Sequence, residues 1–168
     1  YAPGDRESRD RALGNLYAYL ATAVSAEAAQ KIAAAIERIW LDPSSPTISV
    51  LMERAIKAAK ENNTDLAMKL MDAVVKLAPD YAEGWNRRAF VFHMQENPAG
   101  AMRDLQRALA LDPNHFKALD GVSKVLLSAG KKKAALKAMR QLQEIHPHWP
   151  GIAQSIEDLA REVEGQGI

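Results

Sequence analysis

The sequence repeats itself at a spacing of 34 residues. Small residues, prolines and large apolar residues all recur at this spacing. The columns are Ala67, Ala101 and Ala135; Ala55, Ala89 and Ser123; Pro79, Pro113 and Pro147; Leu51, Trp85 and Leu119; and Met71, Leu105 and Met139. A fixed period of about 20–50 residues is typical of supersecondary units that stack side by side and share one core. The period therefore predicts a repeat architecture.

Each repeat divides into two amphipathic runs joined by a short break. The three units span roughly residues 48–81, 82–115 and 116–149. Their first runs lie at 48–61, 82–95 and 116–129, and their second runs at 65–77, 99–111 and 133–145. The chain is rich in Ala and Leu and has 6% aromatic residues, which favours helix over strand. The sequence therefore predicts an all-α chain built from antiparallel helix pairs.

The two ends of the chain depart from the repeat. Residues 1–9 are expected to form a loosely ordered polar leader, and residues 10–43 a degenerate helical hairpin that covers the N-terminal end of the stack. Residues 150–164 place their apolar side chains on one helical face, which predicts a capping helix. The link at 43–46 is short and stiff, so the chain is expected to form one structural domain.

Composition excludes several classes of protein. The net charge of +1 gives no global attraction for nucleic acid or membranes, and no run of apolar residues is long enough to span a bilayer. The chain has no cysteine, which excludes thiol catalysis and cysteine-ligated zinc. His93 and His115 lack metal-ligand spacing, and the His146-Pro147-His148 segment lacks a third ligand nearby, so no metal or other cofactor is predicted. No catalytic motif is present, so an enzyme is not expected.

The repeats resemble tetratricopeptide repeats over about residues 48–149. The residues that carry the resemblance are Trp85, Ala89, Phe92, Ala101, Leu105, Ala108 and Pro113. The whole chain is also similar to small tetratricopeptide proteins of alphaproteobacteria, in residues 77–89 and 145–150. The family implies a right-handed superhelix, an α-solenoid of antiparallel helix pairs. The bacterial relatives often carry an export signal, and the numbering begins at Tyr1 rather than Met, so a periplasmic or otherwise exported location is expected, with a cytoplasmic one as the alternative.

The resemblance also implies where a partner binds, because the first helices of such repeats line a concave groove. The groove positions are the second, fifth, sixth, ninth and twelfth residues of each unit. The residues expected to form an apolar floor are Met52, Ile56 and Phe90. The residues expected to act as polar clamps are Asn86, Arg87, His93, Lys117, Asp120 and Lys124. Together they suit an extended or helical peptide.

The sequence therefore predicts a non-enzymatic adaptor or scaffold that binds an unidentified protein or peptide in its groove. One alternative is a self-associating structural scaffold, with a homodimer formed through either end of the chain. A more remote alternative is a hydrolase or a metal-binding protein. Chaperone tails are not an expected partner. The family's carboxylate clamp falls on Met52, Ile56, Arg87, Lys117 and Gly121, and of these Lys117 alone agrees with it.

Some charged residues have both a functional and a structural interpretation. Asn86 and Arg87 either bind a partner or take part in a structural ion pair. Arg88 occupies a position usually filled by Leu, so it is expected to pair with an acid such as Asp104 or Asp120, because buried arginines are generally paired.

Two features near the C-terminus also have two interpretations. Lys131–Lys133 either attracts an anionic partner or forms a solvated turn, and the solvated turn is favoured because no interleaved aromatic residues support stacking on nucleic acid. Trp149 is interpreted as an anchor that packs the capping helix onto the third repeat rather than as a platform for a ligand.

Overall fold

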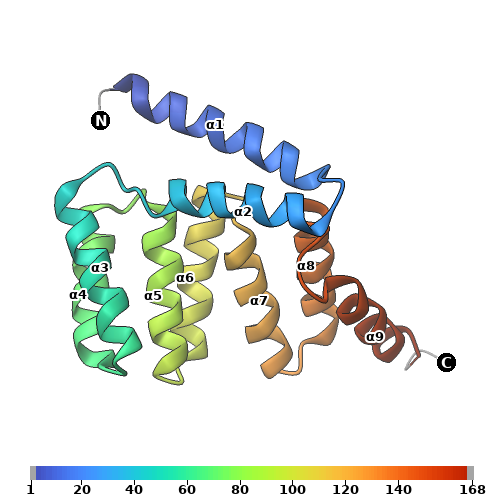
Figure 1. Cartoon of the computed structure of the whole chain (residues 1–168). Helices are drawn as coiled ribbons and strands as arrows, with labels where there is room; N and C mark the ends of the chain where they lie inside the picture. Colours follow the sequence, from blue (N-terminus) through green and yellow to red (C-terminus); the bar gives the residue numbers. More distant parts are fainter. Residues whose placement is uncertain (1–2, 166–168) are drawn as a thin grey trace. The chain divides into compact units, whose positions relative to one another are not determined.

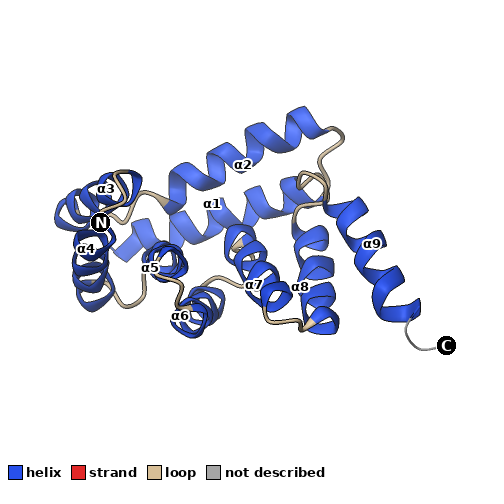
Figure 2. Cartoon of the chain, turned by 90° about the horizontal axis from the view of Figure 1, so that it is seen from below, coloured by secondary structure: helices blue, strands red, loops and turns tan. Residues whose placement is uncertain are grey.

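A computed structural model describes the backbone of residues 3–165 and the side chains of residues 5–165. This part of the chain forms nine α-helices and no strand (Figures 1 and 2). The helices are α1 (Pro3–Ala21), α2 (Ala26–Trp40), α3 (Pro46–Lys60), α4 (Thr64–Leu77), α5 (Ala82–Met94), α6 (Pro98–Leu111), α7 (Phe116–Ser128), α8 (Lys132–Ile145) and α9 (Ile152–Gly165). The all-α prediction is confirmed. Among these helices, none is long and apolar enough to cross a membrane.

The described residues group into two compact units. The first unit consists of residues 3–6 and Arg38–His115 and contains α3 to α6. The second consists of Glu7–Glu37 and residues 116–165 and contains α7 to α9 with most of α1 and α2. The second predicted repeat therefore ends where the first unit ends.

The turns inside the three hairpins repeat with the same period as the sequence. Each first helix is followed by a residue with positive φ, at Asn62, Glu96 and Gly130. The next residue precedes the second helix. Asn63 and Asn97 cap α4 and α6 by accepting a backbone N–H three residues on, whereas Lys131 has no side chain able to do so. Each second helix, α4, α6 or α8, has 14 residues, and all three begin and end at equivalent positions.

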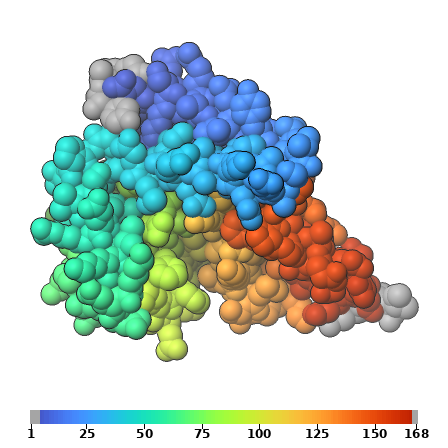
Figure 3. All heavy atoms as spheres, viewed as in Figure 1, coloured from blue at the N-terminus to red at the C-terminus, as the bar shows by residue number. Residues whose placement is uncertain are grey.

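The first unit packs two antiparallel hairpins, α3–α4 and α5–α6, around small and apolar side chains (Figure 1). Ala67 and Ala101 are at most 1% exposed, which confirms that the helices of each hairpin approach closely at this column. In the space-filling view, the side chains of α3 form a continuous outer surface on this side of the unit (Figure 3). Met52 of α3 is 3% exposed and belongs to this core cluster. Its assignment to the floor of a binding groove is wrong, because the side chain is enclosed by its neighbours.

The second unit packs the α7–α8 hairpin with α9 against α8. Ala135 is fully buried, as Ala101 is in the first unit. Ile152 and Leu159 of α9 are buried, and Ile156 and Val163 are half-buried. The apolar face predicted for residues 150–164 is thus the packed face of a helix that begins two residues later.

The N-terminal helix begins earlier than the sequence predicts. Residues 3–9 belong to α1, so the expectation of a loosely ordered leader is wrong for them, and residues 1–2 lie outside the described residues. Pro3 suits a first helical turn because its missing N–H needs no partner there, and Asp5 complements the helix dipole. Arg11 pairs with Glu7 at 3.1 Å one turn along the helix. These local interactions favour helix despite the polar composition.

Candidate functional site

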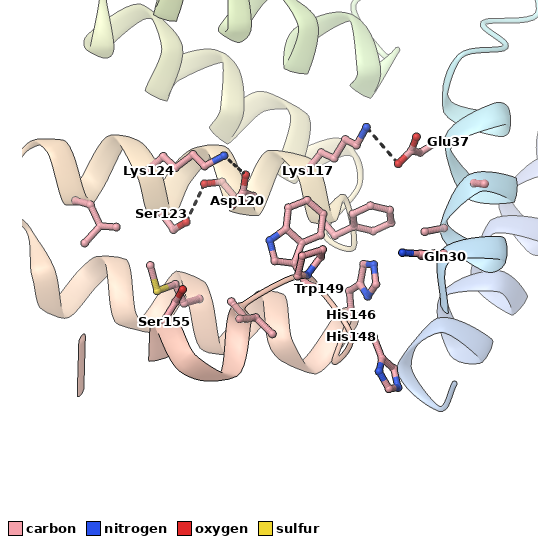
Figure 4. Close-up of a pocket in the computed structure, with 17 residues that line it drawn as sticks. Gln30, Glu37, Lys117, Asp120, Ser123, Lys124, His146, His148, Trp149 and Ser155 are labelled. Atoms are coloured by element: carbon pink, nitrogen blue, oxygen red, sulfur yellow. Dashed lines mark hydrogen bonds and ion pairs between the residues drawn. The ribbon is translucent and has the colours of Figure 1, made fainter. Parts of the chain in front are cut away.

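A cleft of about 770 Å³ lies in the second unit (Figure 4). Its walls come from α2, α7, α8, the turn after α8 and the start of α9. Most of its lining is apolar, including Phe116 and Leu127 of α7, Met139 of α8, Trp149 of the turn and Ile152 of α9. Lys117, Asp120 and Lys124, which the sequence predicts as clamps, all line it.

Helix α7 presents these three polar residues to the cleft because they are spaced three and four residues apart and so share one helical face. The Lys124 ammonium lies 2.7 Å from the Asp120 carboxylate, and the Lys117 ammonium lies 3.2 Å from the Glu37 carboxylate of α2. The Ser123 hydroxyl donates to the Asp120 carbonyl at 2.8 Å. The charges of the cleft wall are therefore paired, with two lysines against two carboxylates.

The turn between α8 and α9 places His146 and Trp149 at the cleft. The His146 N–H donates to the Leu142 carbonyl at 2.8 Å and so ends α8, and the Trp149 N–H donates to the His146 carbonyl at 2.9 Å. Gly151 has a φ of 73°, a conformation that residues with a side chain rarely adopt, and α9 starts directly after it. The turn at His146 and the turn at Gly151 thus fix the positions of the His146 and Trp149 rings.

Phe116, His146 and Trp149 form a cluster of three aromatic rings. The His146 ring meets the Phe116 ring at 5.2 Å and 79°, and the Trp149 ring at 5.6 Å and 81°. The Phe116 and Trp149 rings are 6.0 Å apart. The two contacts of His146 are edge-to-face and the Phe116–Trp149 contact is tilted, so the three rings form one packed cluster. Trp149 contacts the third repeat, as its predicted role as an anchor requires.

His146 is 5% exposed, and its Nδ1 atom has no hydrogen-bond partner among the described residues. Burial lowers the pKa of His146 below its ordinary value, the nearby His148 lowers it further, and Glu37 acts in the opposite direction. Burial and the neighbouring His148 therefore favour the neutral form of the His146 ring. His148 has a partner, since its Nε2 donates to the Ala23 carbonyl at 2.9 Å. Within the described chain, no group of three or more histidines or carboxylates is placed to hold a metal ion.

In the first unit, the predicted groove face of α5 is built around a buried carboxylate. Glu83 is 2% exposed and accepts hydrogen bonds from Arg87 Nε at 2.7 Å and Asn86 Nδ2 at 3.3 Å. Its second oxygen lies 2.7 Å from His115 Nε2, and the His115 ring stacks on Trp40 at 3.8 Å. Burial alone would raise the pKa of Glu83, but the hydrogen bond and charge of His115 and the charge of Arg87 outweigh it and lower the pKa.

The α5 residues therefore divide into two groups. Asn86 and Arg87 are engaged by Glu83, which supports their structural interpretation. Phe90 is 55% exposed and His93 is exposed, so both remain accessible on α5. Ile56 of α3 is half-buried.

Arg88 makes the predicted ion pair. It donates to both oxygens of Asp104 at 2.7 and 3.0 Å and to Asp72 at 3.1 Å. Its guanidinium also lies over the Trp85 ring, 5.1 Å from the ring centroid. Arg88 thus fills a position where Leu is usual in this repeat by satisfying its charge within the hairpin.

The chain matches known repeat proteins in sequence and in fold. The family model described as tetratricopeptide repeat matches residues 82–115, the second predicted unit. A TPR repeat-containing protein of Rhizobium etli is 33% identical over 153 residues, which cover 91% of this chain and 75% of that protein.

Two solved structures show the likeness in fold. The first TPR of Spaghetti (RPAP3), bound to the HSP90 peptide SRMEEVD, has a TM-score of 0.66 and 20% identity and covers 71% of this chain and 95% of that chain. The TPR2B domain of yeast Sti1, in complex with pHsp70, has a TM-score of 0.62 and 18% identity and covers 73% of this chain and 99% of that chain. The chain belongs to the tetratricopeptide-repeat family and has the fold of a TPR solenoid domain. Domains of this kind are protein-interaction modules, generally without catalytic activity.

Proposed function

We propose that this chain is a non-enzymatic adaptor that binds a short segment of a partner protein in the cleft of the second unit. The cleft itself carries the proposal. Its volume of about 770 Å³ lies within the range of about 300–1,000 Å³ that is usual for ligand sites. It opens beside Lys117, Asp120 and Lys124, which are first-helix positions of the third repeat.

The shape and lining of the cleft favour a short segment over a folded domain. A cleft bounded on several sides by helices admits a few side chains and not a broad flat surface. Its apolar walls offer burial to an apolar side chain, which contributes about 25 cal/mol for each Å² removed from water. Leu127 is 37% exposed in the free chain, so a bound segment would cover apolar area that water now reaches.

The partner we propose is not a chaperone tail, although the similar RPAP3 domain was solved with an HSP90 peptide and the similar Sti1 domain in complex with pHsp70. The first clamp position is occupied here by the buried Met52 and the last by Gly121. Lys117, which does agree with the clamp, is paired with Glu37 at 3.2 Å. A terminal carboxylate would find few free donors at these positions.

In the first unit, Phe90 and His93, both exposed on α5, are proposed as a second contact surface. Asn86 and Arg87 would support this surface through Glu83 rather than clamp a partner themselves. The self-associating scaffold, the homodimer and the exported location stay predictions from the sequence.

Selection from a phage-displayed library of random dodecapeptides tests the proposal. Enriched peptides are synthesised with a fluorescent label, and their affinity is measured by anisotropy for the wild-type chain, Leu127→Ala and Leu66→Ala. We expect Leu127→Ala to weaken binding by about fivefold or more, since an apolar contact of the cleft is lost. Leu66→Ala serves as the matched control, because it makes the same change at a 45% exposed leucine on α4 of the other unit. Failure to enrich any peptide, or equal affinity for wild type and Leu127→Ala, would overturn the proposal.

A further inference from the structure

The turn that carries His146 has equivalents at Ala78 and Asp112, each directly before a proline and each with the same backbone hydrogen bonds. Asp42 also stands before a proline, and the carboxylates of Asp42 and Asp112 each accept a backbone N–H two residues on, from Ser44 and Asn114, at 3.0 Å. His146 precedes Pro147, yet its Nδ1 atom has no partner among the described residues. Both aspartates are thus satisfied within their own turns, whereas His146, at the wall of the cleft, keeps an unsatisfied ring nitrogen.

An unsatisfied polar atom on a side chain that is 5% exposed costs free energy, and a partner supplied by a ligand would recover it. A neutral imidazole has one N–H donor and one acceptor nitrogen. A peptide group also has one donor and one acceptor, so it matches the ring in either tautomer. In Figure 4 the amide of Gln30 extends from α2 toward His146, and it gives the same cleft a second uncharged polar group.

The charges of the cleft restrict the chemical class of the ligand further. The four charged side chains of the cleft are already paired, Lys117 with Glu37 and Lys124 with Asp120. A charged ligand would compete with these pairs for Lys117, Lys124 or their carboxylates, and loss of its lysine would leave Asp120, whose side chain is 19% exposed, partly buried without a partner. An uncharged ligand leaves both pairs intact.

We propose that the cleft selects an uncharged, apolar stretch of polypeptide. One backbone amide of this stretch hydrogen-bonds to the His146 ring, and an aliphatic side chain packs against Leu127, Met139 and Trp149. This selectivity rests on the proposed function, namely that the second unit binds a peptide, and it adds the chemistry of the segment that is bound.

Three blocked tripeptides test the selectivity on the full-length chain. They are acetyl-Leu-Ala-Leu-amide and the two analogues with Lys or Glu in place of the central Ala. Their binding is followed by NMR through the indole N–H of Trp149 and the ring nitrogens of His146, with the Trp85 indole as an internal reference in the first unit. We expect the neutral peptide to shift the Trp149 and His146 signals and leave Trp85 unmoved. The charged analogues should bind about fivefold or more weakly.

Two variants separate the hydrogen bond from packing. His146→Phe keeps an aromatic ring and removes both ring nitrogens, and we expect it to weaken the neutral peptide by about twofold to tenfold, the range of a single hydrogen bond. Leu127→Ala, at a partly exposed position, should weaken all three peptides by a similar factor because it removes a shared contact. If His146→Phe does not fold, the shift of the His146 ring nitrogens in the wild-type chain decides the point.

The outcomes distinguish the proposed selectivity for uncharged peptides from the proposed function, which is peptide binding in the second unit. Equal binding of the charged peptides, or unchanged ring nitrogens of His146 at saturation, would overturn the selectivity while the function stands, provided that Leu127→Ala still weakens binding. If none of the three peptides moves Trp149 or His146, the selectivity is overturned as well. The random dodecapeptide selection then decides whether the chain binds peptides of another kind.

Discussion

The two units fill the same repeat positions with different chemistry. In the first unit, Arg88 of α5 forms two hydrogen bonds with Asp104 of α6. The residues 34 positions later, Val122 of α7 and Ala138 of α8, are apolar. A buried ion pair contributes little more stability than a well-packed apolar pair, whereas one partner left alone is costly. The position therefore tolerates either chemistry, provided that both partners change together.

The first-helix faces show the same contrast at another shared position. Glu83 in the first unit is 2% exposed and is held by Arg87, Asn86 and His115. Lys117, 34 residues later, is half-buried and pairs with Glu37 beside the cleft. One face is thus closed by its own polar network and the other borders a cleft. Equivalent repeat positions therefore determine where a side chain lies, but they do not determine which interactions it makes.

The largest effect is expected from breaking the Arg88–Asp104 pair on one side. Arg88→Val should lower the free energy of unfolding by about 3–5 kcal/mol, because the Asp104 carboxylate, 4% exposed, loses its main partner. The double variant Arg88→Val, Asp104→Ala reproduces the apolar pair of the second unit and should recover most of that loss. Urea denaturation of the single and double variants measures both values. A double variant no more stable than Arg88→Val would show that the units are not interchangeable at this position.

Overpacking the alanine column is expected to have the next largest effect, and here the two units should agree. Ala101→Leu and Ala135→Leu should each cost about 1–3 kcal/mol of stability, because both alanines are at most 1% exposed between the helices of a hairpin. Ala99→Leu and Ala134→Leu are matched controls, since these neighbouring alanines are exposed. Thermal and urea denaturation give the comparison. A cost in one unit and none in the other would mean that the hairpins are packed differently.

The alanine column, which is buried in both units, shows which part of the fold the sequence predicts. Side-chain size along one helix decides how closely the next helix approaches, so the columns predicted the hairpins and their ends to within about two residues. The contact of Trp40 with His115 joins residues far apart in sequence, and Trp40 lies outside the repeats, so no periodic signal announced it. Met52 was misplaced because a first-helix position does not reveal what covers it.

The cleft could be predicted only in part. Lys117, Asp120 and Lys124 follow from the repeat register, but the walls from α2 and α9 come from segments that do not repeat. His146 was considered as a metal ligand and not as a cleft residue. A signal was available nonetheless, since His146 stands 34 residues after Asp112, and both lead a turn directly before a proline.

Acid should destabilise the two units at different pH values, through groups whose pKa is lowered in the folded chain. His146 has a pKa below its ordinary 6.5, so the unfolded chain gains a proton first, and stability falls as pH decreases from about 6.5 toward the folded pKa. Glu83 has a pKa below its ordinary 4.5, so the stability that it contributes is complete above that value and is lost as pH falls below it.

The variants His146→Phe and Glu83→Gln separate these two ranges. His146→Phe should remove the decline just below pH 6.5 and leave the one below pH 4.5, and Glu83→Gln should do the reverse. Unfolding free energies measured by urea titration across this pH range provide the test. A decline below pH 6.5 that persists in His146→Phe would show that it does not come from His146.

The smallest effect is expected from an exposed ion pair that shares its spacing with a more buried one. Lys124 pairs with Asp120 four residues earlier on α7, as Arg87 pairs with Glu83 on α5. The Lys124 side chain is 72% exposed, so water screens the pair, and Lys124→Ala should cost about 0.5 kcal/mol or less. Arg87→Ala should cost more, because Glu83 is 2% exposed and its carboxylate would lose a partner that water cannot replace.

Raising the salt concentration should reduce the small effect of Lys124→Ala further and leave most of the effect of Arg87→Ala, since salt screens exposed charges more than buried ones. If both variants lose equal stability and respond equally to salt, the contrast between the closed face of α5 and the open face of α7 does not hold.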